Sequence, residues 1–358
     1  MTRLGEGALA QGTDPEIESP STCDGPRALL LEAREVPLGG VRAMQVHRSL
    51  PQRALPMVGA WCFLDRFGPQ VAKMRVEPHP HIGLQTVTWP FVGTTRHRDV
   101  LGNDVEIRRG ELNIMTSGAG IAHSEYSVGD GEAEIDALQF WVALPESRRH
   151  GPPDFEQVRD LPVVDLGGGA CAAVVVGSFA GVESPARMYT PIVGAEVFVP
   201  AGTRVTLPLN PAWEHALVGV EGEASAVTGL AASRVDAEGA TDSGGNGTGD
   251  VDGGDGVDAG ATTAVAPQHL LYLGLGRSEL VVRADIDTTV FLIGGEPFEA
   301  DIVMWWNFVG RSHDEIVEAR EDWESDSARF GHVVGHGDER IPAPPMPAVR
   351  LTQRRRRV

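Results

Sequence analysis

Two short motifs constrain the fold of this chain more than any other feature, because each places two possible metal ligands two residues apart. The first contains His79 and His81 in PHPHIG, and the second contains His123 and Glu125 in AHSEY. Residues two apart on a β-strand point to the same face of the sheet. Both motifs therefore predict strands, and a β-barrel would bring the two pairs to one interior.

Three imidazoles and one carboxylate form a ligand set of nitrogen and oxygen atoms. This set suits iron, manganese, cobalt, nickel or copper, and its lack of cysteine distinguishes it from a structural zinc site. A six-coordinate ion would keep about two positions open for water, substrate or dioxygen. Periodicity alone leaves the alternative open that the two pairs are ordinary strand residues.

The remaining sequence divides into two strand-rich blocks. Short apolar runs separated by turns fill residues 28–146 and again residues 166–345, a pattern typical of barrels or sandwiches. We expect two all-β domains, the second a barrel or a sandwich, joined by a proline-containing connection at 147–165. Polar composition predicts a disordered tail at 1–27, and residues 346–358 form a basic tail with four consecutive arginines.

Two features interrupt the second block. Residues 230–264 consist mainly of Ala, Gly, Ser, Thr and Asp, which predicts a flexible surface insertion between two strands. A helix is predicted over residues 313–324, because Ser312 and Glu315 form a capping box and apolar residues recur at helical spacing. We expect the apolar stripe of this helix to pack on the second barrel.

Charge and cysteine content predict which partners the protein does not bind and in which cellular compartment it lies. The chain has 30 Lys and Arg against 50 Asp and Glu, a net charge of −20, which disfavours direct nucleic-acid binding. No apolar run is long enough for a membrane span, and no secretory signal is recognisable. The scattered cysteines Cys23, Cys62 and Cys171 read as free thiols in a reducing compartment, which predicts a cytoplasmic protein.

The segment from Pro78 to Tyr126 closely resembles the signature of the pirin family in the cupin superfamily. That signature has three parts in order, HPHxGxxTVT, GxxxHxD and MTxGxGIxHSE. They match His79–Thr88, Gly93–Asp99 and Met115–Glu125. Similar motifs, including FLDRFGP at Phe63–Pro69, extend the resemblance over about residues 28 to 345.

The resemblance implies a bicupin, with two cupin-type barrels and one metal in the N-terminal barrel. It implies that His79, His81, His123 and Glu125 bind non-haem Fe(II), with Mn, Ni, Co or Cu as alternatives. The second block has no HxH pair, so one metal per chain is expected. A monomer is the state that the resemblance implies.

Two positions depart from the family pattern. Most pirins have Glu at the position of Gln85, so this chain lacks a possible second carboxylate, and the charge or hydrogen bonding near the ion is expected to differ. Arg66 replaces a His that is usual in the FLDHFGP segment. We expect Arg66 to affect only the rim of the site or the groups around the ligands.

Other residues are candidates for supporting roles. His97 and Asp99 share one strand face and match a family motif that does not bind metal, so we expect them to support the ligands. Trp89, Phe91 and Met115 are predicted to line an apolar pocket for a flat substrate, or else to belong to the barrel core.

The resemblance implies two classes of function. In the first, the protein is a dioxygenase that opens a flavonol such as quercetin, a small aromatic substrate, and Glu125 takes the 3-hydroxyl proton as general base. In the second, the metal is a redox switch without turnover, and a protein partner such as a transcription factor or a metabolic enzyme reads its state. A purely structural metal is a third interpretation, although structural sites tend to be closed and rich in cysteine.

Overall fold

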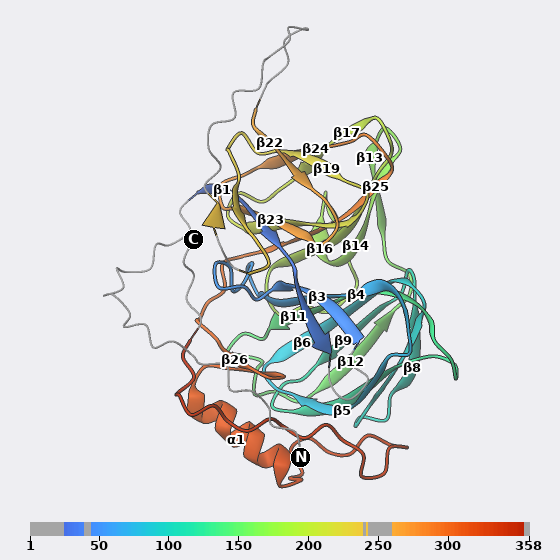
Figure 1. Cartoon of the computed structure of the whole chain (residues 1–358), viewed down its shortest axis with the longest axis vertical. Coiled ribbons are helices and arrows are strands. Elements are labelled where there is room, and N and C mark those ends of the chain that lie inside the picture. Colours follow the sequence, from blue (N-terminus) through green and yellow to red (C-terminus); the bar gives the residue numbers. More distant parts are fainter. Residues whose placement is uncertain (1–24, 39–43, 239–240, 243–259, 354–358) are drawn as a thin grey trace, which may run out of the picture.

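The computed structural model describes residues 25–38, 44–238, 241–242 and 260–353. These residues form two β-barrels stacked along the long axis of the molecule, with one helix, α1 (His313–Glu324), at the far end of the N-terminal barrel (Figure 1). The predicted all-β bicupin with a short C-terminal helix is confirmed. The 12-residue helix, the only one in the described part of the chain, is too short to cross a membrane. Most of the predicted tail at 1–27 and the Arg354–Arg357 run lie outside the described residues.

The N-terminal barrel consists of a seven-stranded and a four-stranded sheet. The larger sheet has the order β12-β9-β6-β11-β4-β3-β2, and the smaller one has the order β5-β10-β7-β8. The strands of the larger sheet are β2 (Arg34–Leu38), β3 (Met44–Leu50), β4 (Trp61–Ala72), β6 (Leu84–Val92), β9 (Leu112–Thr116), β11 (Ala133–Ala143) and β12 (Asp154–Val158). Those of the smaller sheet are β5 (Arg75–His81), β7 (Thr94–Asp99), β8 (Asp104–Arg108) and β10 (Ile121–Ser127).

The C-terminal barrel pairs a ten-stranded sheet with a four-stranded sheet. The larger sheet runs β13-β14-β16-β25-β18-β23-β1-β20-β21, with β15 beside β14, and the smaller one runs β17-β24-β19-β22. The strands of the larger sheet are β1 (Pro26–Glu32), β13 (Val163–Gly167), β14 (Ala170–Phe179), β15 (Val182–Glu183), β16 (Ile192–Val199), β18 (Glu214–Glu221), β20 (Ser233–Val235), β21 (Thr241–Asp242), β23 (His269–Gly274) and β25 (Thr288–Gly295). Those of the smaller sheet are β17 (Thr203–Pro208), β19 (Ala224–Val227), β22 (Thr262–Val265) and β24 (Glu279–Ala284).

The predicted barrel boundaries are wrong at both ends of the first block. Most of strand β1 lies within the predicted N-terminal barrel at 28–146, but the strand pairs with β23 and β20 of the C-terminal sheet, where Leu29 and Leu31 are buried. The predicted connection at 147–165 contains β12, which pairs with β9 and extends the N-terminal sheet. The sequence of an apolar strand predicts the strand itself. It does not predict the sheet that the strand joins, because this depends on which sheet has an unpaired edge strand nearby.

The predicted packing of helix α1 is also wrong, because the chain leaves the C-terminal barrel after β25. A short hairpin of β26 (Val303–Trp305) and β27 (Phe308–Gly310) follows, and Phe308 forms a parallel bridge with Ile82 beside β5. The buried helix residues Ile316, Ala319 and Trp323 therefore pack in one cluster with Ile82 and other side chains of the N-terminal barrel. Figure 1 shows α1 far from the C-terminal barrel.

The predicted insertion at 230–264 is shorter than expected. Strands β20 and β21 and most of β22 lie inside this range, and Val235 in β20 and Val265 at the end of β22 are buried. Residues 239–240 and 243–259 lie outside the described residues. The apolar valines at both ends anchor the segment in the two sheets of the C-terminal barrel.

The two barrels differ in what fills them. Apolar side chains such as Val197, Leu207 and Leu271 fill the C-terminal barrel. A separate apolar cluster joins the two barrels, with Trp61 and Phe140 of one against Phe291 of the other. The interior of the N-terminal barrel instead holds the histidines of both sequence motifs.

Candidate metal centre

Three neighbouring strands carry the candidate ligands. Strand β10 lies between β5 and β7, and its register places His123 opposite His79 on one side. On the other side, Glu125 lies opposite His97. A β-bulge follows His123 on the β5 side, which changes the direction of the strand between the two residues of the HSE motif.

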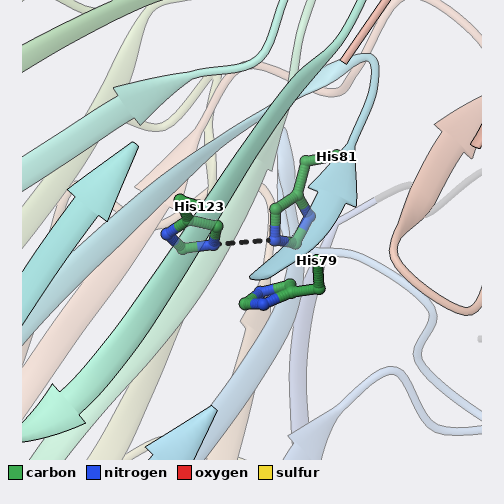
Figure 2. A group of neighbouring side chains, drawn as sticks. All are labelled: His79, His81 and His123. Atoms are coloured by element: carbon green, nitrogen blue, oxygen red, sulfur yellow. Dashed lines mark hydrogen bonds between the residues drawn. The ribbon is translucent and has the colours of Figure 1, made fainter. Parts of the chain in front are cut away.

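The three predicted histidine ligands converge. The ligand nitrogens of His79, His81 and His123 all lie within 4.8 Å of one another, and Figure 2 shows the three rings facing one point. The Nε2 atoms of His81 and His123 are 3.1 Å apart. Two nitrogens bound at right angles with bonds of about 2.1 Å would lie about 3.0 Å apart. The observed spacing therefore fits two neighbouring ligands of one ion.

Each of the three imidazoles has a hydrogen-bond partner at its other nitrogen. Nδ1 of His79 lies 2.9 Å from the carbonyl oxygen of Glu77, and Nδ1 of His81 lies 3.0 Å from that of Asn307. A carbonyl only accepts, so both Nδ1 atoms donate and both Nε2 atoms keep a lone pair. Such outer partners fix the tautomer and orientation of metal-binding histidines.

His123 is oriented through a chain that ends at Asp99. His97 Nε2 lies 3.0 Å from the Asp99 carboxylate, and His97 Nδ1 lies 3.2 Å from His123 Nδ1. With both rings neutral, His97 donates to Asp99 and accepts from His123, so His123 Nε2 also keeps a lone pair. The result is two lone pairs facing each other at His81 and His123, an arrangement that a cation would stabilise.

Burial keeps the candidate ligands unprotonated. It lowers the pKa of His79 to about 4 and also lowers the pKa of His81 and His123 well below the usual value. Neighbouring imidazoles act in the same direction on all three rings. Neutral imidazole is the form that binds metals, so the donor set fits a divalent ion.

Glu125 lies beside this cluster. Its carboxylate is grouped with His97 and His123, again with ligand atoms within 4.8 Å of one another, and not with His79 and His81. Burial raises the pKa of the Glu125 carboxyl. Without a nearby cation the group therefore tends toward its protonated form, and a metal ion would reverse this tendency.

The cluster opens onto a cavity of about 490 Å³ with apolar and aromatic walls. The rings of Phe63 and Trp141 stack with centroids 4.0 Å apart, and Trp141 also contacts His81 edge to face. The Arg75 side chain lines the cavity and is 53% exposed, so the cavity reaches the surface. Further wall residues come from the β26–β27 hairpin, namely Met304, Trp305, Trp306 and Asn307.

The predicted pocket residues Trp89 and Phe91 are elsewhere, in the apolar cluster between the barrels. Trp89 Nε1 donates to Glu196 of the C-terminal barrel at 2.6 Å. Gln85, on the same face of β6, donates to Thr116 and to the carbonyl of Arg187, away from the cavity. Gln85, Trp89 and Phe91 are not among the described residues that line the cavity. Met115 is not among them either, and it pairs with Thr86 and Phe155 in the sheet.

Arg66 is likewise remote from the cavity and joins the two barrels. Its guanidinium makes two hydrogen bonds to Asp136 at 2.7 and 2.8 Å and one to the carbonyl of Val220 at 2.6 Å. The expected effect at the rim of the site is therefore wrong. This position of the FLDRFGP segment instead serves contact between the two barrels.

Sequence reasoning missed most of the cavity wall. Phe63 lies in the FLDRFGP segment and Asn307 in the IVMWWNFV segment at Ile302–Val309, which also resembles the family, but Trp141 and Gln139 lie in a run that reads as an ordinary strand. A weak signal existed for Trp141 and Gln139, which alternate with the apolar residues of β11 that face the other barrel. The IVMWWNFV segment gives no sign that Asn307 lies beside His81, which is 226 residues away in the sequence.

The C-terminal barrel has no comparable centre among its described residues. His215 is buried there, with its pKa lowered to about 4 by burial, but it has no cluster of possible ligands around it in the described chain. A third group of possible ligands, Glu77, His336 and Glu339, lies outside the cavity on the N-terminal side. Arg75 pairs with both carboxylates of that group.

Two stacked β-barrels with a three-histidine cluster inside one of them define a bicupin with a candidate metal site. The sequence profile named Pirin matches residues 42–142, and that named Pirin C-terminal cupin domain matches residues 194–331. The chain belongs to the pirin family.

Relatives of known name extend this result. A Pseudomonas aeruginosa protein named "Putative quercetin 2,3-dioxygenase" is 38% identical over 319 residues, which cover 88% of this chain and 89% of that protein. The crystal structure of a quercetin 2,3-dioxygenase from Acinetobacter baumannii is 34% identical with a TM-score of 0.77, and the match covers 91% and 98% of the two chains. A bacterial pirin from Escherichia coli in complex with nickel(II) shares the fold at 16% identity and a TM-score of 0.52, over 75% of this chain and all of that one.

Proposed function

We propose that this protein is a metal-dependent dioxygenase that opens the ring of a flavonol such as quercetin. The observation that carries the proposal is the three-histidine cluster at the wall of an aromatic cavity that reaches the surface. An accessible cavity at the ligands distinguishes such a site from a closed structural one. The names of two relatives support the same class of substrate.

The proposed ligands are His79, His81, His123 and Glu125, and the proposed native metal is Fe(II). A bacterial pirin of the same fold from E. coli is known in complex with nickel(II), which supports a divalent ion as the bound group. When bound, the metal would act as a Lewis acid on a substrate hydroxyl and would supply the redox chemistry that dioxygen requires. A cytoplasmic monomer remains part of the proposal.

The side chains of the cavity have separate tasks in this proposal. The Phe63 and Trp141 rings, which stack on each other, would form an apolar wall for a flat substrate next to His81. The Glu125 carboxylate lines the same cavity and would accept the 3-hydroxyl proton of the flavonol. Burial raises the pKa of this carboxyl and a bound ion would lower it again, so the carboxylate would be available to accept the proton beside the metal.

Oxygen uptake by the Fe(II)-loaded protein, prepared without air and then given quercetin, tests the proposal. We expect uptake to match quercetin loss and to disappear in His81→Ala and Glu125→Gln. Glu106→Gln and His332→Ala are matched controls, since both residues are exposed and outside the cavity. Stoichiometric iron without uptake in the wild-type protein would exclude quercetin as substrate and favour the redox-switch function.

A further inference from the structure

The β26–β27 hairpin supplies part of a site that belongs to the other barrel. It follows the last strand of the C-terminal barrel, yet it docks beside β5, where Val309 N donates to the carbonyl of Ile82 at 3.1 Å. Close packing leaves no room at this contact, since a Cβ on Gly83 would lie 2.0 Å from the Val309 carbonyl oxygen. Four consecutive hairpin residues, Met304, Trp305, Trp306 and Asn307, line the cavity.

One candidate ligand depends on this hairpin. The Nδ1 partners of His79 and His123 come from the N-terminal barrel itself, as the Glu77 carbonyl and the His97 ring. His81 alone is held by a distant segment, through the Asn307 carbonyl at 3.0 Å. Because this hydrogen bond fixes the tautomer and direction of the ring, the placement of the turn sets the placement of Nε2.

The turn itself is strained. Trp306 and Asn307 connect the two strands, and Trp306 has a φ of 51°, in the left-handed region. Glycine is usual at the first position of such two-residue turns, and a bulky residue there persists only when its surroundings hold it. The Trp306 ring packs edge to face against Phe308, with centroids 5.3 Å apart and planes at 86°. Phe308 is fully buried.

We propose that Trp306 is a positioning residue of the metal centre: its left-handed backbone conformation in the two-residue turn keeps the Asn307 carbonyl at His81. Metal binding and hairpin docking then stabilise each other, because a bound ion holds the His81 ring and the ring holds the turn. The inference rests on the proposed metal site but does not depend on the substrate.

Cobalt(II) affinity of three variants tests the role of the turn. Trp306→Gly removes the indole and keeps the left-handed conformation, so we expect an affinity within about threefold of wild type. Trp306→Val removes the indole and disfavours that conformation, so we expect an affinity about 10- to 100-fold lower and an altered cobalt absorption spectrum. Ala180→Val is the matched control, since Ala180 has a φ of 49° in an exposed turn of the C-terminal barrel. It should bind cobalt as the wild type does.

Hydrogen exchange supplies a second readout, which a merely structural role of Trp306 would not change. We expect cobalt to slow exchange of the Val309 amide in the wild-type protein and not in Trp306→Val. Equal cobalt affinity of the Gly and Val variants, or Val309 exchange that does not respond to cobalt in the wild type, would overturn the inference. If Trp306→Val does not fold, Trp306→Ala takes its place under the same criteria.

These measurements need neither quercetin nor dioxygen. A wild-type protein that shows the expected cobalt and exchange results without oxygen uptake would refute the proposed function and leave the inference standing. A wild-type protein that binds no cobalt would refute the metal centre and the inference together.

Discussion

Replacing Asp99 by Asn tests how the protein sets the protonation of its own candidate ligands. The Asp99 carboxylate accepts hydrogen bonds from His97 Nε2, from the backbone amides of Leu101 and Asn103, and from the Asn103 side chain. Burial opposes ionisation of Asp99, but the hydrogen bonds from His97 and Asn103 outweigh it and lower its pKa. All of its neighbours are donors, so an amide NH₂ at this position must face another donor.

In Asp99→Asn, the backbone amides of Leu101 and Asn103 both donate to the single side-chain oxygen. The side-chain NH₂ group therefore faces His97. His97 then favours the tautomer with its proton on Nδ1, and that proton faces His123. His123 would in turn carry its proton on Nε2, the atom that faces His81 at 3.1 Å. A protonated Nε2 cannot bind metal, so the substitution acts on the ligand through two rings.

We expect nickel(II) affinity of Asp99→Asn to fall about 10- to 100-fold, the usual effect of losing an outer partner. This corresponds to about 1.4 to 2.7 kcal/mol of binding free energy. Isothermal titration calorimetry with a competing chelator measures the change. The control is Asp104→Asn on the neighbouring strand β8, since Asp104 pairs with the exposed Arg96. A folded Asp99→Asn protein with nickel affinity within twofold of wild type would refute the tautomer argument.

Two further predictions concern stability. The metal-free protein should lose free energy of unfolding as the pH falls from about 6.5 to about 4. The unfolded chain binds protons in this range, whereas buried His79, with its pKa of about 4, does not. Urea denaturation should show a loss of about 3 kcal/mol from His79, and a flat profile would contradict this. Arg66→Ala should lower the free energy of unfolding by about 3 to 5 kcal/mol, because it leaves the buried Asp136 carboxylate without its partner. Arg96→Ala, which breaks an exposed pair, should cost about 1 kcal/mol or less, and similar losses in the two variants would disprove the importance of burial.

The period of a β-strand explains which parts of the site were predictable. His79 and His81, like His123 and Glu125, are two residues apart, and a strand of any barrel would put each pair on one face. The pairs therefore came together in the structure along with His97, although Glu125 lies nearer to His123 than to the other two histidines. These relations depend only on local geometry and on neighbouring strands.

The same period explains the failure at Gln85, Trp89 and Phe91. These residues alternate along β6 and share the face that meets the C-terminal barrel. Eight of the nine β6 residues are buried, so no contrast between apolar and polar positions distinguishes the interior face from the domain interface. The position of α1 was unpredictable for another reason, because it depends on where the hairpin docks and not on the helix itself.

The extensive contact between the two barrels explains how the N-terminal barrel can have a polar interior. A cluster of buried, neutral histidines and an open cavity contribute little apolar burial to the N-terminal barrel. Its seven-stranded sheet compensates on the opposite face, where Trp61 and Phe140 pack against the C-terminal barrel and Trp61 Nε1 donates to the carbonyl of Gly294 at 3.1 Å. The C-terminal barrel, which is filled with apolar side chains, thus stabilises the N-terminal barrel, whose interior holds the polar residues of the site. The hairpin that follows this barrel forms part of the cavity wall and bonds to His81 through the Asn307 carbonyl. A change in the backbone at Trp306 should therefore alter the position of the His81 ring.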